Sequence, residues 1–333
     1  MTQTMFRAMV VEETADHQFK SGIQTKAVSD LPKGDVLIKV HYSSLNYKDA
    51  LSASGNKGVT RRYPHTPGID AAGEVADSNS DEFSIGEPVL VTGHDLGMNT
   101  SGGLAEYIRV PAEWVVRLPH GMTLKQSMMY GTAGVTAALS VLKLEDAGIT
   151  PQSGDILVTG ASGGVGSLAV AILAAAGYSA VGASGKPEAA DFLTKLGAKE
   201  VIDRHDAIDA SGRPLLKTRF AAAIDTVGGD FLSFALSSIQ YGGAVTCCGN
   251  AASPELNLTV YPFILRGISL IGIDSAECPK EIRRAVWNRL AGEWHRPDLE
   301  PMTAEISLED VSERMAAMLK GTHKGRCIVK IIQ

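Results

Sequence analysis

Residues 46–49, Asn-Tyr-Lys-Asp, form a short polar cluster in an otherwise apolar stretch of the chain. They follow residues 35–42 (DVLIKVHY), whose pattern is typical of a strand. Four hydrogen-bonding or ionisable side chains in a row are costly to bury without partners. We expect Asn46 and Tyr47 to be catalytic, because a phenol can donate a proton and an amide can hold a developing charge. A packed tyrosine with a satisfied hydroxyl is the alternative.

The second candidate for chemistry is a glycine-rich turn in residues 156–170, ILVTGASGGVGSLAV. It follows a strand-like run and opens a helix-like run, which is the context of a dinucleotide fingerprint. Ala161 replaces the first glycine of G-x-G-x-x-G, and Gly163 and Gly166 supply the other two. Glycines let the backbone approach a pyrophosphate, and the helix N-terminus presents N–H groups to it. The turn predicts cofactor contacts from Ala161, Ser162, Gly163, Gly164, Val165 and Gly166, unless it is a glycine-rich turn that binds nothing.

The end of the next strand indicates which dinucleotide would bind. NAD sites usually carry an acidic residue about 20 positions beyond the glycines, where it binds the ribose 2′-hydroxyl. This chain has Ser184, Gly185 and Lys186 there instead. A hydroxyl and an ammonium favour a 2′-phosphate, and Arg204, after the third strand, could close the same pocket. The sequence therefore predicts NADPH over NADH, although a loop lysine can also be merely solvated.

Other chemistries lack their usual residues. The eight histidines and four cysteines show neither zinc-ligand spacing nor an H-E-x-x-H motif, so we expect no metal site. The G-x-S-x-G match at residues 160–164, GASGG, belongs to the glycine-rich turn, so we do not expect serine hydrolysis. Asp70, in PGIDAAGEV, is expected to be a buried, paired acid with a structural role.

The pattern of strands and helices indicates two domains. Residues 1–120 read as short strands bounded by Gly and Pro, which suggests a β-rich, partly open barrel. Residues 124–145 have helical spacing and predict one or two helices. Apolar strands then alternate with helices, which predicts a parallel sheet covered on both faces. We expect one domain from residues 1–123 and 276–333, with an α/β domain of residues 124–275 inserted in it.

Composition narrows the class of partner and compartment. The formal net charge is −6 and the pI is about 5.8, which argues against a nucleic-acid binder. No 18-residue apolar span and no signal-peptide pattern are present, so we expect neither a membrane segment nor secretion. Four cysteines without a paired pattern favour the reducing cytoplasm. Cys247 and Cys248 are expected to be buried thiols on a strand.

Taken together, these segments resemble a known family. The resemblance spans nearly the whole chain and is carried by NYKDAL, HTPGIDAAGEV, GGLAEYIRVP, YGTAGVTAA, VTGASGGVGSLAV, ASGK, DTVGG and PFILRGISLIGIDS. These blocks are similar to the medium-chain dehydrogenase/reductase superfamily, in its zinc-free quinone oxidoreductase branch. The GID, ASGK and PFILRG blocks look most like the bacterial YhdH/YhfP type, whose members include NADPH-dependent acrylyl-CoA reductases.

The resemblance implies a GroES-like catalytic domain, a Rossmann cofactor domain and a homodimer. The apolar strand expected at residues 268–275 is a candidate dimer edge. The resemblance also implies that Tyr47 lies beside the nicotinamide and that further residues contact the cofactor: Thr132, Asn250, Ile264, Ser275 and Arg326. Glu200 stands where some relatives carry a basic residue near the 2′-phosphate.

The implied activity is metal-independent reduction of an activated C=C bond, most specifically acrylyl-CoA to propanoyl-CoA. Arg61 and Arg62 are candidates to meet the phosphates of a CoA thioester. Reduction of a quinone, or of a small enone or enal, would use the same hydride geometry, and a non-catalytic NADPH-binding protein is a third alternative. The residues leave open the natural substrate, the stereochemistry and pathway, and whether Tyr47 donates a proton or positions the reactants.

Overall fold

A computed structural model describes residues 4–332 of the chain. The chain divides into two compact units, unit 1 (Met1–Thr132, Ala276–Trp287 and Thr303–Gln333) and unit 2 (Ala133–Ser275 and Asn288–Met302). These bounds differ from the expected ones at 124–132, which belong to unit 1, and at 288–302, which belong to unit 2.

Local contacts account for both differences. Helix α2 (Leu124–Asp146) loses its helical backbone at Gly131, so its first turns separate from the rest. The side chain of Arg289 donates to both carboxylate oxygens of Glu145, at 2.5 and 3.1 Å. Arg296 donates to the carbonyl oxygens of Ala171 and Leu196, at 2.7 and 2.9 Å. These bonds tie residues 288–302 to unit 2.

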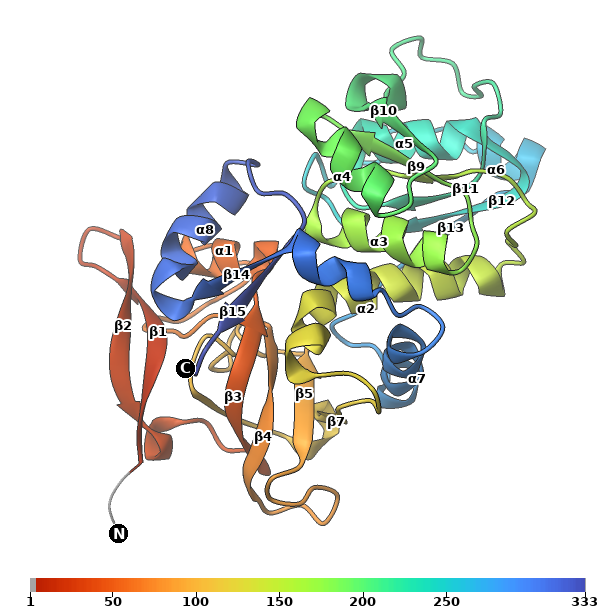
Figure 1. The fold of residues 1–333 in the computed structure, drawn as a ribbon. Helices are drawn as coiled ribbons and strands as arrows, with labels where there is room; N and C mark the ends of the chain where they lie inside the picture. The colour runs from red at the N-terminus through yellow and green to blue at the C-terminus, as the bar shows by residue number, and fades with distance from the viewer. Residues whose placement is uncertain (1–3, 333) are drawn as a thin grey trace. The chain divides into compact units, whose positions relative to one another are not determined.

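Unit 1 is built on a seven-stranded sheet and a two-stranded ribbon. The ribbon pairs β1 (Met5–Glu13) with β2 (Phe19–Ala27). The sheet runs in the order β14-β15-β3-β4-β5-β7, with β6 paired to β3. Its strands are β3 (Val36–Ser44), β4 (Asp70–Ser78), β5 (Pro88–Thr92), β6 (Tyr107–Val110), β7 (Val116–Arg117), β14 (Thr303–Ser307) and β15 (Arg326–Lys330). The C-terminal strands β14 and β15 thus join β3 across most of the chain length, as Figure 1 shows.

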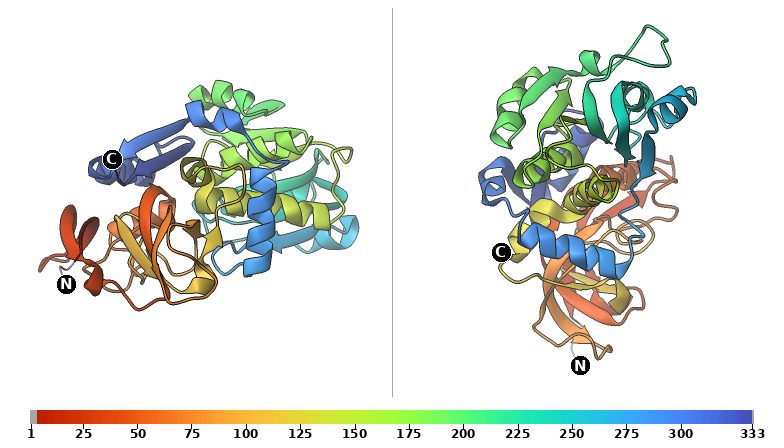
Figure 2. Two further views of the ribbon diagram at one scale, coloured as in Figure 1. Left: turned by 60° about the horizontal axis from the view of Figure 1, so that its bottom comes forward. Right: turned by 90° about the vertical axis from the view of Figure 1, so that its right-hand side faces the viewer.

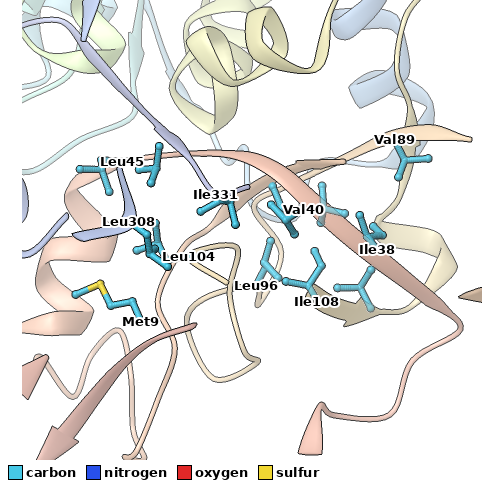
Figure 3. Packing of buried hydrophobic residues seen from close by; sticks show 14 of the residues in the cluster. Met9, Ile38, Val40, Leu45, Val89, Leu96, Leu104, Ile108, Leu308 and Ile331 are labelled. Atoms are coloured by element: carbon cyan, nitrogen blue, oxygen red, sulfur yellow. The ribbon is translucent and has the colours of Figure 1, made fainter. Parts of the chain in front are cut away.

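The core of unit 1 follows the alternation of its strands. Val36, Ile38 and Val40 of β3 are at most 1% exposed because alternate residues of a strand face the same side. They pack with residues from β1, β5 and the C-terminal segment, including Met9, Val89 and Ile331 (Figure 3). Two helices lie wholly within unit 1, α1 (Tyr47–Ala53) and α8 (Val311–Leu319), and they contact each other. Helix α7 (Lys280–Ala291) begins in unit 1 and ends in unit 2.

Unit 2 is a doubly wound parallel sheet, which confirms the predicted fold class. Its six strands run in the order β10-β9-β8-β11-β12-β13, the 3-2-1-4-5-6 order of a Rossmann sheet. They are β8 (Ile156–Val158), β9 (Ala180–Ser184), β10 (Glu200–Asp203), β11 (Phe220–Asp225), β12 (Ile239–Cys247) and β13 (Ser269–Gly272). The unit's own helices are α3 (Gly164–Ala175), α4 (Ala190–Lys195), α5 (Gly229–Ser238) and α6 (Tyr261–Arg266). Figure 2 shows helices on both faces of this sheet.

None of the helices in residues 4–332 combines the length and the apolar character needed to cross a bilayer.

Candidate active site

A buried polar network in unit 1 centres on Asp70, the first residue of β4, which is fully buried. One carboxylate oxygen accepts from the Ser44 hydroxyl at 2.5 Å and from the Asn46 amide at 2.7 Å. Thr132 donates from its hydroxyl at 2.6 Å and from its backbone N–H at 2.9 and 3.0 Å. Asp70 is therefore the buried, paired acid that the sequence predicted, and it orders residues from three separate segments.

Arg326, the first residue of β15, brings a positive charge into the same network at only 4% exposure. Its guanidinium donates to the Ser44 hydroxyl at 2.7 Å, so Ser44 bridges Arg326 and Asp70. It also donates to Met129 O at 3.0 Å, Leu45 O at 3.1 Å and Asn46 Oδ1 at 3.4 Å. Burial lowers the pKa of Arg326, and the nearby Asp70 charge opposes that effect. The donors of Arg326 are thus spent on the protein itself.

Asp49 fastens the start of α1 to the turn before β4. Its carboxylate accepts from the backbone N–H groups of Asn46 at 2.7 Å, Gly68 at 3.1 Å and Ile69 at 2.9 Å. The side chain is fully buried. Burial, reinforced by the Asp70 charge, raises the pKa of Asp49 to about 7, while the three N–H donors pull it down. Asp49 supports the position of Asn46 and Tyr47 rather than facing solvent.

Gly131 breaks α2 beside this network, so the predicted helical region is two helices joined at a kink. Its φ is 52° and its ψ −155°, a conformation that favours glycine. A Cβ atom there would lie 2.4 Å from Asp70 Oδ2, 2.6 Å from Ser44 Oγ and 3.0 Å from Arg326 Nη2. The missing side chain therefore makes room for the network, and the kink aims Thr132 at Asp70.

Tyr47 and Asn46 differ in whether their polar groups already bond other residues of the protein. Tyr47 is 47% exposed at the start of α1, and no described residue bonds its hydroxyl. The Asn46 amide donates to Ser44 O at 3.4 Å and to Asp70 at 2.7 Å, so both amide hydrogens have acceptors inside the protein. Asn46 therefore neither bonds the Tyr47 hydroxyl nor presents a donor to a ligand in this structure. It orients the helix start that carries Tyr47.

In unit 2 the glycine-rich turn lies between β8 and α3, as the sequence predicted. Gly160 adopts a φ of 60°, so it supplies the left-handed turn that Ala161 cannot. A Cβ on Gly166 would lie 2.3 Å from Gly160 O, which is why the helix can pack this closely. Gly163 caps α3, and the first-turn N–H groups that follow have no intrahelical acceptor. The glycines and these amides fit a pyrophosphate.

The second group of unit 2 lies at the end of β9. The Ser184 hydroxyl donates to Ser162 Oγ at 3.1 Å and accepts from the Lys186 backbone N–H at 3.1 Å. A Cβ on Gly185 would lie 2.5 Å from Arg204 Cδ, so the Arg204 side chain rests against this glycine. The structure thus brings together Ser162, Ser184, Gly185, Lys186 and Arg204, and we refer to these five residues as the β9 end group.

Glu200 lies away from the β9 end group, contrary to what the resemblance implies. It pairs with Val181 in the sheet, whereas Asp203, just before Arg204, pairs with Ser184. At about 3.3 Å per residue, three residues place Glu200 about 10 Å along the strand from that end. Its carboxylate meets Arg219 at 3.3 Å instead.

Comparisons with known proteins point to one family. Residues 32–120 match a family described as "Alcohol dehydrogenase GroES-like domain", and residues 164–291 match "Zinc-binding dehydrogenase". The chain is 47% identical over 330 residues to "Putative quinone oxidoreductase YhfP" of Bacillus subtilis, covering 98% of this chain and 99% of the relative. It is 41% identical over 328 residues to "Acrylyl-CoA reductase AcuI" of Ruegeria pomeroyi, with the same coverage.

Solved structures agree. Escherichia coli YhdH with bound NADPH matches with a TM-score of 0.94 at 44% identity, covering 98% of this chain and all of that one. Bacillus subtilis YhfP with NAD bound matches with a TM-score of 0.95 at 46% identity and the same coverage. The chain belongs to the medium-chain dehydrogenase/reductase superfamily. Its fold is therefore the GroES-like and Rossmann combination that the sequence implied, and it is a member of an oxidoreductase family.

One of the two matching families is named for zinc binding. Among residues 4–332, no group of three or more His, Cys, Asp or Glu could hold a metal ion. His65 is buried and bonds Gly97 O at 2.9 Å, while His94 stacks on Trp114. Burial lowers the pKa of His94 to about 4, so it is a neutral, packed side chain.

The remaining expected cofactor residues of unit 2 are dispersed. The Ser275 hydroxyl lies 2.7 Å from the Thr136 hydroxyl. Asn250 is exposed after β12, and Ile264 is 71% exposed on α6.

Sequence reasoning missed the residue that joins two loops of this sheet. Asp225, at the end of β11, is fully buried and accepts from the Thr159 hydroxyl at 2.7 Å and the Gly228 N–H at 2.8 Å. Burial raises the pKa of Asp225. It fixes the start of the glycine-rich turn to the loop after β11. The only signal was the D-T-V-G-G sequence beginning at Asp225.

Cys247 and Cys248 were expected to be buried on a strand, and that is partly wrong. Cys247 ends β12 and Cys248 follows it, and both are half-buried. The Cys248 thiol donates to Asp225 O at 3.3 Å. Burial and the Asp225 charge raise the pKa of Cys248 to about 12, so it stays protonated.

Proposed function

We propose that this chain is an NADPH-dependent reductase of activated C=C bonds, and that its substrate is an enoyl-CoA thioester, acrylyl-CoA, which it converts to propanoyl-CoA. The observation that carries this proposal is the full-length similarity to a relative named acrylyl-CoA reductase. The geometry adds two supports, a glycine cradle that fits a pyrophosphate and an end of β9 without a carboxylate.

The choice of NADPH rests on the β9 end group. The hydroxyl of Ser184, the ammonium of Lys186 and the guanidinium of Arg204 favour a 2′-phosphate through charge-assisted hydrogen bonds. An acidic residue in place of Ser184 would repel it. The amides of Gly164, Val165 and Gly166 would hold the pyrophosphate, with Ala161, Ser162 and Gly163 shaping the turn. Among the similar solved structures, YhdH contains bound NADPH and YhfP contains bound NAD.

When bound, the cofactor supplies the hydride that reduces the β-carbon. The protein's part is to orient the substrate, to stabilise negative charge on the thioester carbonyl oxygen and to let a proton reach the α-carbon. Tyr47 is the residue we assign to the reactants, because its phenol is exposed and no described residue bonds it. We propose that the Tyr47 hydroxyl positions the reactants by hydrogen bonding. Proton donation by the same hydroxyl is the alternative role.

The Asp70 network supports the assignment of Tyr47, because it fixes the segment that carries this residue. Asn46, held by Asp70 and Arg326, is a positioning residue that fixes the first turn of α1. Thr132 gives its hydroxyl proton to Asp70, so its oxygen can only accept from a ligand. We also propose the other cofactor contacts that the family resemblance implies, from Asn250, Ile264 and Ser275. For Arg326 we propose a structural role in the Asp70 network.

Reduction of a quinone is the second candidate, because the name of YhfP points to it and its identity to this chain is 47%. The two functions are separated by following NADPH oxidation with acryloyl-CoA, crotonyl-CoA, a small enone and a simple quinone. We expect the largest kcat/KM with acryloyl-CoA. Equal or better turnover of the quinone would contradict the thioester proposal. Tight NADPH binding without oxidation by any of them would indicate a non-catalytic protein.

We further propose that the enzyme is a cytoplasmic homodimer. All four cysteines are free, which suits a reducing compartment. Strand β13 is an edge of the unit 2 sheet and pairs only with β12 among the described residues, while Leu270 on it is 36% exposed. An exposed apolar edge strand can pair with another chain, and we propose that a second copy of this chain pairs through β13. Sedimentation of the wild type and of Leu270→Lys tests this, with a shift to monomer expected for the variant.

A further inference from the structure

The loop between α1 and β4 carries two exposed arginines. Arg61 and Arg62 lie on the surface of unit 1, and no carboxylate within residues 4–332 forms an ion pair with either of them. The backbone N–H of Arg61 is held by Asn99 Oδ1 at 3.3 Å. In a chain of net charge −6, two neighbouring unpaired guanidinium groups form a local site for an anion.

The loop is folded back onto the end of α1. The hydroxyls of Ser52 and Thr60 lie 2.7 Å apart in a buried bond, and the Tyr63 hydroxyl donates to Ser52 O at 2.5 Å. Within the loop, Asn56 accepts from Thr60 N at 3.0 Å and from Gly58 N at 2.9 Å. The residues on both sides of the arginine pair are therefore fixed to the same helix residue, Ser52.

A lysine holds this loop against the β1–β2 ribbon. The Lys57 ammonium meets Glu13 Oε2 at 2.7 Å and lies 4.7 Å from the ring centre of Tyr63 and 5.3 Å from that of Phe19. The two rings are themselves 4.8 Å apart. A Cβ on Gly55 would lie 2.0 Å from the Phe19 ring, so the ring packs directly on the loop backbone. We call Glu13, Phe19, Lys57 and Tyr63 the lysine clamp.

We infer that the lysine clamp is a specificity device that holds Arg61 and Arg62 in place for the phosphates of a CoA thioester. This inference rests on the proposed function. Lys57 is a positioning residue in it, because its own charge is occupied by Glu13 and the two rings. Arg61 and Arg62 are the binding residues.

The length of α1 sets the spacing that the inference needs. Tyr47 begins α1 and Ser52, which anchors the arginine loop, lies near its end. The five residue steps from Tyr47 to Ser52 span about 7.5 Å along the helix, at about 1.5 Å each. In a CoA thioester the long pantetheine arm separates the reacting acyl group from the phosphates. The inference therefore assigns the acyl group to the start of α1, at Tyr47, and the phosphates to the loop anchored near its end, at Arg61 and Arg62.

A clamp matters energetically because a loop that is ordered before binding loses less entropy when the ligand arrives. Immobilising a long side chain or loop residue costs about 0.5–1.5 kcal/mol. Cation–π contacts and an ion pair that already hold the loop remove part of that cost. Loosening the clamp is then expected to weaken binding of the phosphate-bearing part of the substrate without changing the chemical step.

The experiment compares CoA itself, acryloyl-CoA and the acryloyl thioester of N-acetylcysteamine, which lacks every phosphate. The Kd of CoA is measured by calorimetry on the NADP-saturated enzyme, and KM and kcat are measured for both thioesters. For Lys57→Met we expect the Kd of CoA and the KM of acryloyl-CoA to rise roughly tenfold, because the loop must then be ordered when the ligand binds. The kcat, and the KM of the truncated thioester, should stay within about twofold of the wild type.

Three further variants keep the result interpretable. Lys57→Arg retains a cation between the rings and should restore the wild-type Kd. Arg61→Ala with Arg62→Ala, both on exposed side chains, should weaken CoA at least as much as Lys57→Met. Lys20→Met removes an exposed charge from the same ribbon outside the clamp and should change nothing. If Lys57→Met does not fold, Phe19→Leu and the arginine pair carry the same test.

Several outcomes overturn the inference. An unchanged Kd of CoA in Lys57→Met and in the double arginine variant would show that the arginines are merely solvated. An equal rise of KM for both thioesters would show a general structural role of the clamp. A wild type that binds CoA through this loop and reduces neither thioester would leave the clamp in place and remove the proposed function.

Discussion

The two polar groups of the molecule are built in opposite ways. In unit 1, Asp70 and Ser44 are fully buried and Arg326 is 4% exposed, and their donors and acceptors are directed to each other. In unit 2, Arg204 and Gly185 of the β9 end group are exposed and Lys186 is half-buried. The first arrangement fixes geometry inside the protein, whereas the second keeps the cationic side chains of Lys186 and Arg204 at least partly exposed.

From this difference we expect substitutions in the Asp70 network to lower stability and substitutions in the β9 end group to weaken ligand binding. The largest expected effect is on stability, at Arg326. Arg326→Met should lower the free energy of unfolding by about 3–5 kcal/mol, because removing the guanidinium leaves the buried Asp70 carboxylate without a compensating charge. The matched variant Arg204→Met should change it by less than about 0.5 kcal/mol, since that side chain is exposed. Urea unfolding of both variants is the measurement. Similar losses in the two would mean that the contrast in burial has no energetic consequence.

The next effect is a pH dependence that Asp49 gives to the stability of unit 1. The pKa of Asp49 is raised to about 7 in the folded chain, so the folded state binds this proton more tightly than the unfolded state does. Its contribution to stability is present below the unfolded pKa near 4 and is lost as pH rises to about 7. Since one pH unit corresponds to about 1.4 kcal/mol, the loss is at most about 4 kcal/mol.

The check is the unfolding free energy of the wild type minus that of Asp49→Asn between about pH 3 and about pH 8, roughly one unit to each side of that range. We expect the difference to fall with rising pH. A difference that rises with pH would mean that the three backbone N–H donors outweigh burial and keep Asp49 ionised throughout. A flat difference would place its folded pKa close to that of the unfolded chain.

In unit 2 the corresponding variant should change binding rather than stability. Lys186→Ala should weaken NADPH by roughly 10–100-fold, the loss of one hydrogen bond to a charged group, and NADH by less than about threefold. Fluorescence titration with both cofactors measures this. Equal weakening of NADPH and NADH would contradict the 2′-phosphate assignment, because only NADPH carries that phosphate.

The same contrast explains what could be predicted from the sequence. The β9 end group and the glycine-rich turn lie at strand ends in a repeating pattern, so local rules place Gly163, Ser184 and Lys186. The Asp70 network joins residues about 60 and 250 positions from Asp70 through side-chain bonds, and no periodicity announces such contacts. The roles of Ser44, Gly131 and Asp225 therefore emerged only from the structure. Glu200 shows the reverse case, in which a position inferred from relatives fell at the wrong end of a strand.

The smallest expected effect is that of Tyr47, the exposed residue beside the Asp70 network. Tyr47 lies next to buried Asn46, yet it is 47% exposed and no described residue bonds its hydroxyl. Tyr47→Phe should therefore leave the unfolding free energy unchanged. If the hydroxyl positions the reactants, kcat should fall by no more than about tenfold, one hydrogen bond, with an unaltered pH profile. Proton donation would instead cost about 10²–10⁴-fold and remove an ionisation from the profile, because the phenol would be the general acid. An unchanged kcat would exclude both roles and leave Tyr47 a surface residue beside the network.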